Sequence, residues 1–269
     1  MTNKTIRYAT ILALSTAFIS GIANFVNKFA VSSFDNAVIF TTIKNSLVAV
    51  FILGIFIAIH RWSELKNINR KQWFRLILIG AIGGALPFAL FFTGLSQTSA
   101  VNGALIHKTL FLFVALMAIS FLKEKMVWQQ WLGVAAIFGG NLIVGGFTGF
   151  KFNLGELMIL AATILWAIEN IIAKKALADI SSLTVAGARM ILGSILLALY
   201  VSLTSGFGPI VLLSGNQWWL TILTSVLLLG YVLTWYAALK HAPATYVATL
   251  LTPATLITNI LSAVFVTHA

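Results

Sequence analysis

The chain has 269 residues, of which 60% are hydrophobic and only 9% are charged, and its mean hydropathy is +1.00. A soluble domain carries roughly a quarter charged residues, so this composition excludes a water-soluble fold of this size. The net charge of +11 would suggest nucleic-acid binding in a soluble protein, but here the basic residues lie in short segments between apolar runs, where they indicate membrane topology. There is no cysteine, hence no disulfide and no thiolate metal site.

The apolar runs set the expected architecture. Each is about 20 residues long, enough for a helix to cross a hydrocarbon core about 30 Å thick. Membrane β-strands would alternate apolar and polar residues in segments of about 10, and these runs show no such alternation. We therefore predict an all-α polytopic membrane protein whose nine helices cover residues 8–29, 38–59, 74–95, 103–121, 131–147, 155–174, 185–204, 218–239 and 246–266.

The distribution of Lys and Arg predicts the orientation of these helices. With a cytoplasmic N-terminus, only Lys28 and Lys151 lie outside, and three further basic residues lie within spans. The remaining twelve then lie on the cytoplasmic side, where such residues concentrate. These twelve are Lys4, Arg7, Arg61, Lys66, Arg70, Lys71, Arg75, Lys123, Lys125, Lys174, Lys175 and Lys240.

The sequence repeats itself once, at an offset of 144–146 residues. The segment 24–30 falls on 170–176, and the segment 92–95 falls on 236–239. In the same register Lys44 falls near Arg189, Thr109 falls on Pro253, and Ser99-Ala100 falls on Pro243-Ala244. Because the first copy holds five spans, an odd number, the second copy must enter the membrane from the opposite side. Inverted-topology repeats are common in secondary transporters, with the substrate site between the copies near the midplane.

At these residues the chain resembles the EamA-type branch of the drug/metabolite transporter superfamily. The resemblance rests on four features: Asn27-Lys28-Phe29-Ala30 ending the first span, a basic residue early in spans two and seven, the segment 236–244 leading into Leu251-Thr252-Pro253, and Glu124 followed by Trp131-Leu132-Gly133. It implies two five-helix copies, here residues 8–147 and 155–269, and ten helices with both termini cytoplasmic.

The second copy departs from that family pattern at its end. His268 stands where the first copy has Glu124, and the sequence stops at Ala269, where a tenth helix is expected. Two explanations stay open, a truncated or frameshifted reading frame and a nine-helix variant, and the first is favoured.

Ionisable residues inside a membrane are costly, so each predicts a functional role. Glu169, in span six beside Asn170 and one turn after Trp166, is the strongest candidate. It could take a proton, bind a cationic amine, or pair with a basic neighbour. Its participation in a substrate site is the favoured reading.

Further candidates come from other spans. His107 could relay protons, and Lys108 could hold a carboxylate or phosphate, unless it reaches the outer interface instead. Asn24 and Tyr236 could line a cavity with amide and aromatic groups. The predicted substrate-binding set is therefore Glu169, Asn170, Trp166, Lys108, His107, Asn24 and Tyr236. For Lys44 and Arg189, at equivalent places in the two copies, we predict a structural charge at the interface between them.

These patterns predict a secondary transporter, and the resemblance adds small polar metabolites such as amino acids, exported across a bacterial cytoplasmic membrane. No catalytic motif, metal-ligand pattern or nucleotide motif is visible, so we expect neither enzyme activity nor a cofactor. The expected partners are a small-molecule substrate and membrane lipids, with proton coupling and oligomeric state left open. Two alternatives remain: a carrier of anionic or phosphorylated metabolites, and a non-transporting membrane protein.

Overall fold

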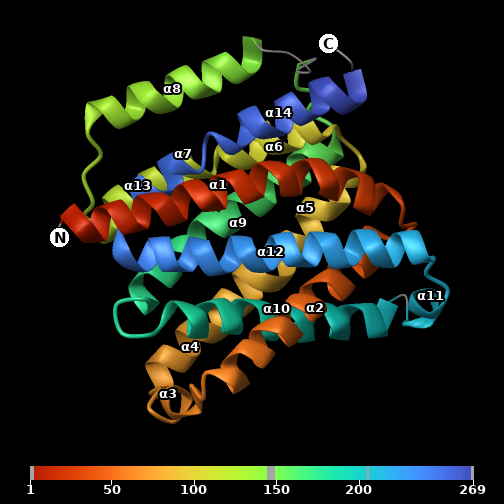
Figure 1. The fold of residues 1–269 in the computed structure, drawn as a ribbon, viewed down its shortest axis with the longest axis horizontal. Coiled ribbons are helices and arrows are strands. Elements are labelled where there is room, and N and C mark those ends of the chain that lie inside the picture. The colour runs from red at the N-terminus through yellow and green to blue at the C-terminus, as the bar shows by residue number, and fades with distance from the viewer. Residues whose placement is uncertain (1–2, 144–148, 205, 268–269) are drawn as a thin grey trace.

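The computed structural model describes residues 3–143, 149–204 and 206–267, and in these ranges every regular element is a helix. Eight helical spans in this part of the chain are long and apolar enough to cross a membrane. Long helices run side by side along the long axis of the molecule (Figure 1). The predicted all-α polytopic membrane fold is confirmed.

The first copy begins with two uninterrupted spans, and its third and fourth spans are each assembled from three helical pieces. These elements are α1 (Asn3–Ser32); α2 (Ala37–Ala58); α4 (Arg70–Leu78), η1 (Ile79–Ala85) and α5 (Leu86–Ser96) in span three; and α6 (Ala100–Lys108), α7 (Leu110–Met117) and η2 (Ala118–Leu122) in span four. A short helix, α3 (Trp62–Lys66), lies in the segment after span two.

A helix, α8 (Trp128–Ile143), occupies the position of the predicted fifth span, but its described part is 16 residues long and is not among the eight, and the predicted end at residues 144–147 lies outside the described ranges. It runs along the edge of the bundle, where it contacts the last span of the second copy (Figure 1). The sequence pairs Gly80 with Gly84 and Ala135 with Gly139 as helix contacts. Gly80 does face Leu192 of span seven, whereas Ala135 is exposed and no described atom lies close to Gly139.

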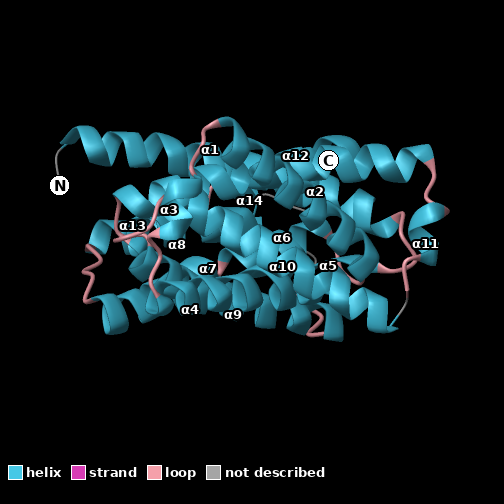
Figure 2. Ribbon diagram, turned by 90° about the horizontal axis from the view of Figure 1, so that it is seen from below, coloured by secondary structure: helices cyan, strands magenta, loops and turns pink. Residues whose placement is uncertain are grey.

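The second copy repeats the plan of the first as far as its fourth span. Its elements are α9 (Leu154–Ala176); α10 (Ser182–Thr204); α11 (Gly208–Val211), a short helix in the loop that follows; α12 (Gly215–His241); and α13 (Ala244–Leu250), α14 (Ala254–Ser262) and η3 (Ala263–Thr267) in span nine. Seen from below, helices fill the molecule from one end to the other and loops gather at both ends (Figure 2).

Polar side chains at the loop ends fix where the spans begin. Asn36, Asn69, Ser99, Asn153 and Ser214 each accept a hydrogen bond from a backbone N–H in the first turn of the helix that follows. Such caps satisfy amide groups that the helix leaves without partners, which a membrane protein needs at the edge of the hydrocarbon. The span limits predicted from the sequence agree with the helix bounds of the structure to within a few residues.

The two copies are interleaved rather than placed beside each other. Span one (α1) lies along span eight (α12), and its counterpart, span six (α9), lies along α5 of span three. Spans two and seven (α2 and α10) contact each other directly. The contact of span one with span eight is thus matched by that of span six with span three, as an inverted repeat requires.

Glycines allow the copies to approach closely. A side chain at Gly84 in η1 would overlap the backbone carbonyl of Arg189, and Gly84 and Gly193 face each other across the contact with α10. Without a hydrophobic driving force between helices in lipid, small residues and close backbone contact hold such crossings together. Gly94 and Gly155 play the same part between α5 and α9.

The fourth span of each copy is interrupted at the same repeat position. The first interruption is at Thr109, between α6 and α7, and the second is at 251–253, between α13 and α14. Pro253 explains the second, since proline lacks the N–H that continues a helix. Interrupted spans of this kind surround the binding sites of many transporters, because they leave backbone groups available inside the membrane.

Candidate functional site

A cavity lies between the two copies within the membrane-spanning part of the molecule. The volume open to water-sized molecules is about 60 Å³. One water molecule needs about 10–15 Å³ of this volume, so the cavity has room for several. Four spans of the first copy and three of the second line it. The lining residues are Ser20, Ala23, Asn24, Asn27, Lys44, Phe88, Phe91, Phe92, His107, Leu110, Trp166, Asn170, Arg189, Leu228 and Tyr231.

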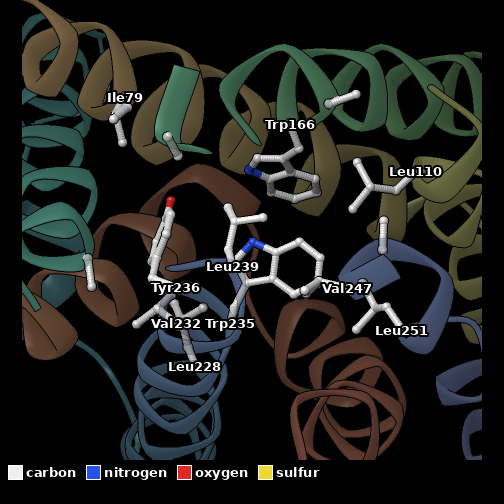
Figure 3. Packing of buried hydrophobic residues seen from close by; sticks show 14 of the residues in the cluster. Ile79, Leu110, Trp166, Leu228, Val232, Trp235, Tyr236, Leu239, Val247 and Leu251 are labelled. Atoms are coloured by element: carbon white, nitrogen blue, oxygen red, sulfur yellow. The ribbon is translucent and has the colours of Figure 1, made fainter. Parts of the chain in front are cut away.

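Aromatic rings form much of the wall. Phe88 and Phe91 of α5 both contact the ring of Trp166, which also lies 4.9 Å from the ring of His107. Trp166 of α9 and Trp235 of α12 lie near each other in the buried layer (Figure 3). Trp235 donates to Asn170 Oδ1 at 2.8 Å. The wall is therefore rigid and apolar, with a few fixed polar groups, as is typical of small-molecule sites.

A buried ion pair stands at one side of the cavity. Arg189 Nη1 lies 3.6 Å from Glu169 Oε2, and both side chains are almost fully buried. Tyr236 donates its hydroxyl to Glu169 Oε1 at 2.5 Å and accepts from Arg189 Nη1 at 3.1 Å. Glu169 packs against Gly83 and does not line the cavity. The carboxylate is thus held by its arginine and tyrosine partners.

A backbone carbonyl near Pro87 in span three accepts hydrogen bonds from two residues of the site. Pro87 has no N–H to donate to Gly83, four residues earlier, so the usual α-helical bond to that carbonyl is missing. Trp166 Nε1 donates to Gly83 O at 2.9 Å, and Arg189 Nε donates to it at 3.2 Å. The widened π-helical turn η1 precedes the proline, as is frequent at functional sites. One backbone carbonyl therefore positions both an indole and a guanidinium.

Lys44 is the second cation of the cavity wall and is 1% exposed. Its Nζ lies 3.4 Å from the centre of the Phe92 ring and donates to Asn27 Oδ1 at 3.3 Å. Among the described residues the side-chain ion pairs are Arg61–Glu64 and Arg189–Glu169, so Lys44 has no carboxylate partner there. Its charge is held by ring faces and one amide oxygen.

Further polar groups line or adjoin the cavity. Lys108 is fully buried rather than at the outer interface, and donates to the cavity-lining Ser20 Oγ at 2.8 Å. In the part of the chain that the structure describes, two buried nitrogens, Asn24 Nδ2 and His107 Nδ1, have no hydrogen-bond partner. Buried polar atoms normally have partners, and Asn24 Nδ2 is a donor, so it marks where a ligand with an acceptor oxygen could bind.

The structure brings the predicted residues together. Asn24, His107, Trp166 and Asn170 line the cavity. Lys108 adjoins it through Ser20, while Glu169 and Tyr236 form the buried cluster with Arg189. The interface charges predicted at Lys44 and Arg189 lie between the copies and in the cavity wall itself.

Sequence reasoning did not find the residues Phe88, Phe91, Asn27 and Ser20 of the cavity wall. Pro87, directly before Phe88, was the available signal, since a proline inside a span marks a break in its hydrogen bonding. No group of three His, Cys, Asp or Glu side chains suited to a metal ion occurs in the described ranges.

The sequence matches the model of the EamA-like transporter family twice, over residues 7–146 and 153–268. The chain belongs to the EamA-like transporter family. This EamA-like chain is 33% identical over 146 residues to the uncharacterized transporter YyaM of Bacillus subtilis, covering 52% of this chain and 48% of that protein. It is 27% identical over 219 residues to the uncharacterized transporter sll1164 of Synechocystis, covering 75% and 62% respectively.

More distant relatives extend the same picture. Human solute carrier family 35 member F6 is 26% identical over 122 residues, covering 41% of this EamA-like chain and 33% of that protein. A solved crystal structure superposes with a TM-score of 0.74 at 15% identity, covering 95% of this chain and 87% of the other, which shows a shared fold. The matched regions span less than two thirds of each of these three curated relatives. The EamA-like protein is thus an integral membrane protein of a family named for transporters.

Proposed function

We propose that the protein is a secondary transporter that exports small polar metabolites, amino acids among them, by alternating access. The observation that carries this proposal is the cavity between the copies, to which equivalent residues of both contribute: Asn24 with Asn170, and Lys44 with Arg189. In an inverted repeat, rocking one copy against the other opens such a site to each side in turn. The proposal rests on that arrangement and on the family.

We further propose that the membrane is the bacterial cytoplasmic membrane and that the N-terminus is cytoplasmic. Contacts between segments support the orientation, because they join basic segments at one end of the bundle. Arg75 at the start of span three donates to the carbonyl of Lys175 at the end of span six, and Lys240 donates to the carbonyls of Leu177 and Ile180. A common basic end is expected to face the cytoplasm.

A carrier of anionic or phosphorylated metabolites is the second candidate. The observation that favours it is the pair of buried lysines, Lys44 and Lys108, neither of which has a carboxylate partner among the described residues. Glu169, which pairs with the cavity-lining Arg189, is already bound to Arg189 and Tyr236. Amino acids also carry an anionic group, their carboxylate, so both candidate functions require a cation in the site.

Counterflow in proteoliposomes tests the proposal. Purified protein is reconstituted and preloaded with unlabelled amino acids, nucleobases or sugar phosphates, and uptake of the labelled compound is measured. We expect saturable uptake of at least one amino acid. A substrate accepted only as a phosphate ester, with Lys108→Gln abolishing its uptake, supports the second candidate. Uptake equal to that of protein-free liposomes for every compound would contradict transport.

A further inference from the structure

The two copies place a cation at equivalent positions in the cavity wall, but among the described residues only one of these cations has a carboxylate counterion. Arg189 lies 3.6 Å from the Glu169 carboxylate and donates to the Tyr236 hydroxyl. Lys44 has one amide oxygen and the face of Phe92. Removing a charge from water without a partner is costly, so this difference between the copies requires an explanation.

The repeat register can be read from the structure itself. Lys28 Nζ donates to the carbonyl of Leu95 at 2.9 Å, where span three ends. Lys174 Nζ donates to the carbonyl of Leu239 at 2.7 Å, where span eight ends. These two contacts are equivalent at offsets of 146 and 144 residues, so the sequence register also holds in three dimensions.

In that register the copy-two cluster of Glu169, Arg189 and Tyr236 corresponds to Ala23, Lys44 and Phe92 in copy one. The cation is kept, whereas the carboxylate is replaced by a methyl group and the tyrosine by a ring without a hydroxyl. Ala23 lines the cavity, while Glu169 does not. The space that a second carboxylate would fill is therefore cavity space next to an unpaired cation.

We propose that the substrate supplies this missing group: a small monocarboxylate binds beside Ala23 with its carboxylate on Lys44. Asn24, whose Nδ2 has no partner, takes the part that the Tyr236 hydroxyl has in the other copy. The rings of Phe91 and Trp166, which touch each other, contact the apolar body of the ligand. One lysine carries one positive charge, so it neutralises a monocarboxylate fully and a phosphate dianion only in part. This inference rests on the proposed function and specifies its substrate class.

The first test needs no ligand. Thermal unfolding of the purified full chain in detergent is measured for Ala23→Glu and for its neutral isostere Ala23→Gln, each with Lys44 and with Lys44→Met. Glutamate at 23 should raise the unfolding midpoint above that of glutamine by at least about 3 °C when Lys44 is present. The difference should vanish in the Lys44→Met background. A difference that is zero, or equal in both backgrounds, overturns the proposed geometry.

The second test measures binding to the wild-type chain by quenching of tryptophan fluorescence, with acetate, benzoate, L-leucine and inorganic phosphate as probes. At least one of the three carboxylates should bind, and its Kd should rise about tenfold or more in Lys44→Met. The Kd should likewise be about tenfold higher for Ala23→Glu than for Ala23→Gln, which fills the same volume. Binding of phosphate alone, of no carboxylate, or of a carboxylate equally to Lys44→Met overturns the proposal.

Together with counterflow in proteoliposomes, these tests distinguish failure of the carboxylate site from failure of the transport proposal. A protein that exchanges a nucleobase in proteoliposomes but binds no carboxylate remains a transporter and has no such site. A protein with carboxylate binding and coupling between positions 23 and 44, but without counterflow of any compound, keeps the site and loses the transport proposal.

Discussion

Replacing Glu169 by glutamine removes the counterion of a buried arginine while keeping the shape of the side chain. At 3.6 Å and an effective dielectric constant of about 20, the attraction between the two charges is about 4–5 kcal/mol. Removing one partner of a buried pair costs about 3–5 kcal/mol, because the remaining charge stays buried without compensation. We therefore expect Glu169→Gln to lower the free energy of unfolding by that amount.

The double variant Glu169→Gln/Arg189→Met is the matched control, because it removes both charges. Replacing a buried pair by groups of similar volume is often nearly neutral, so the double variant should recover most of the lost stability. Unfolding in mixed micelles, followed by circular dichroism, measures all three proteins. Equal losses in the single and double variants, or no loss in Glu169→Gln, would show that the pair does not stabilise the fold as argued.

Three further predictions follow from the same contacts. Lys44→Met should not lower the unfolding midpoint, because it removes a buried charge that has no carboxylate partner among the described residues; a loss as large as that of Glu169→Gln would contradict this. Gly84→Val should destabilise the fold by about 1–3 kcal/mol or more in the same assay, whereas Gly54→Val, at a site without near neighbours, should not; equal effects would argue against the close helix contact. Because the chain has no cysteine, a membrane-impermeant maleimide added to intact cells should label Lys151→Cys and not Lys66→Cys, and the reverse would refute a cytoplasmic N-terminus.

The spans and their repeat could be predicted because their signals are local. Hydrophobic length sets a helix across the membrane, and the register of equivalent residues is visible without knowledge of any contact. Asn24 and Asn170 were found in this way, and the structure places both in the cavity wall. The sequence also predicts that Glu169 lies inside span six, where an ionisable side chain is costly and therefore marks a candidate site.

The partners of these groups could not be predicted. A hydropathy profile gives the depth of a residue in a span, but the rotation and tilt of the span are set by its neighbours. The sequence therefore allows three roles for Glu169, and the structure shows it paired with Arg189. For the same reason the sequence allows Lys108 either at the outer interface or in the interior, and its contact with Ser20 places it inside. Pro87 signals a break in span three, but the donors that bind the Gly83 carbonyl there, Trp166 and Arg189, come from other spans and cannot be read from that signal.

The central claim is that a cavity between two inverted copies opens to each side of the membrane in turn. Ala23→Cys places the only thiol of the chain in the wall of that cavity. Labelling by a membrane-impermeant methanethiosulfonate is measured in right-side-out and in inside-out vesicles, with Gly54→Cys, away from the cavity, as the control. Alternating access predicts that Ala23→Cys reacts from both sides. Reaction from one side only, or from neither, would contradict the account.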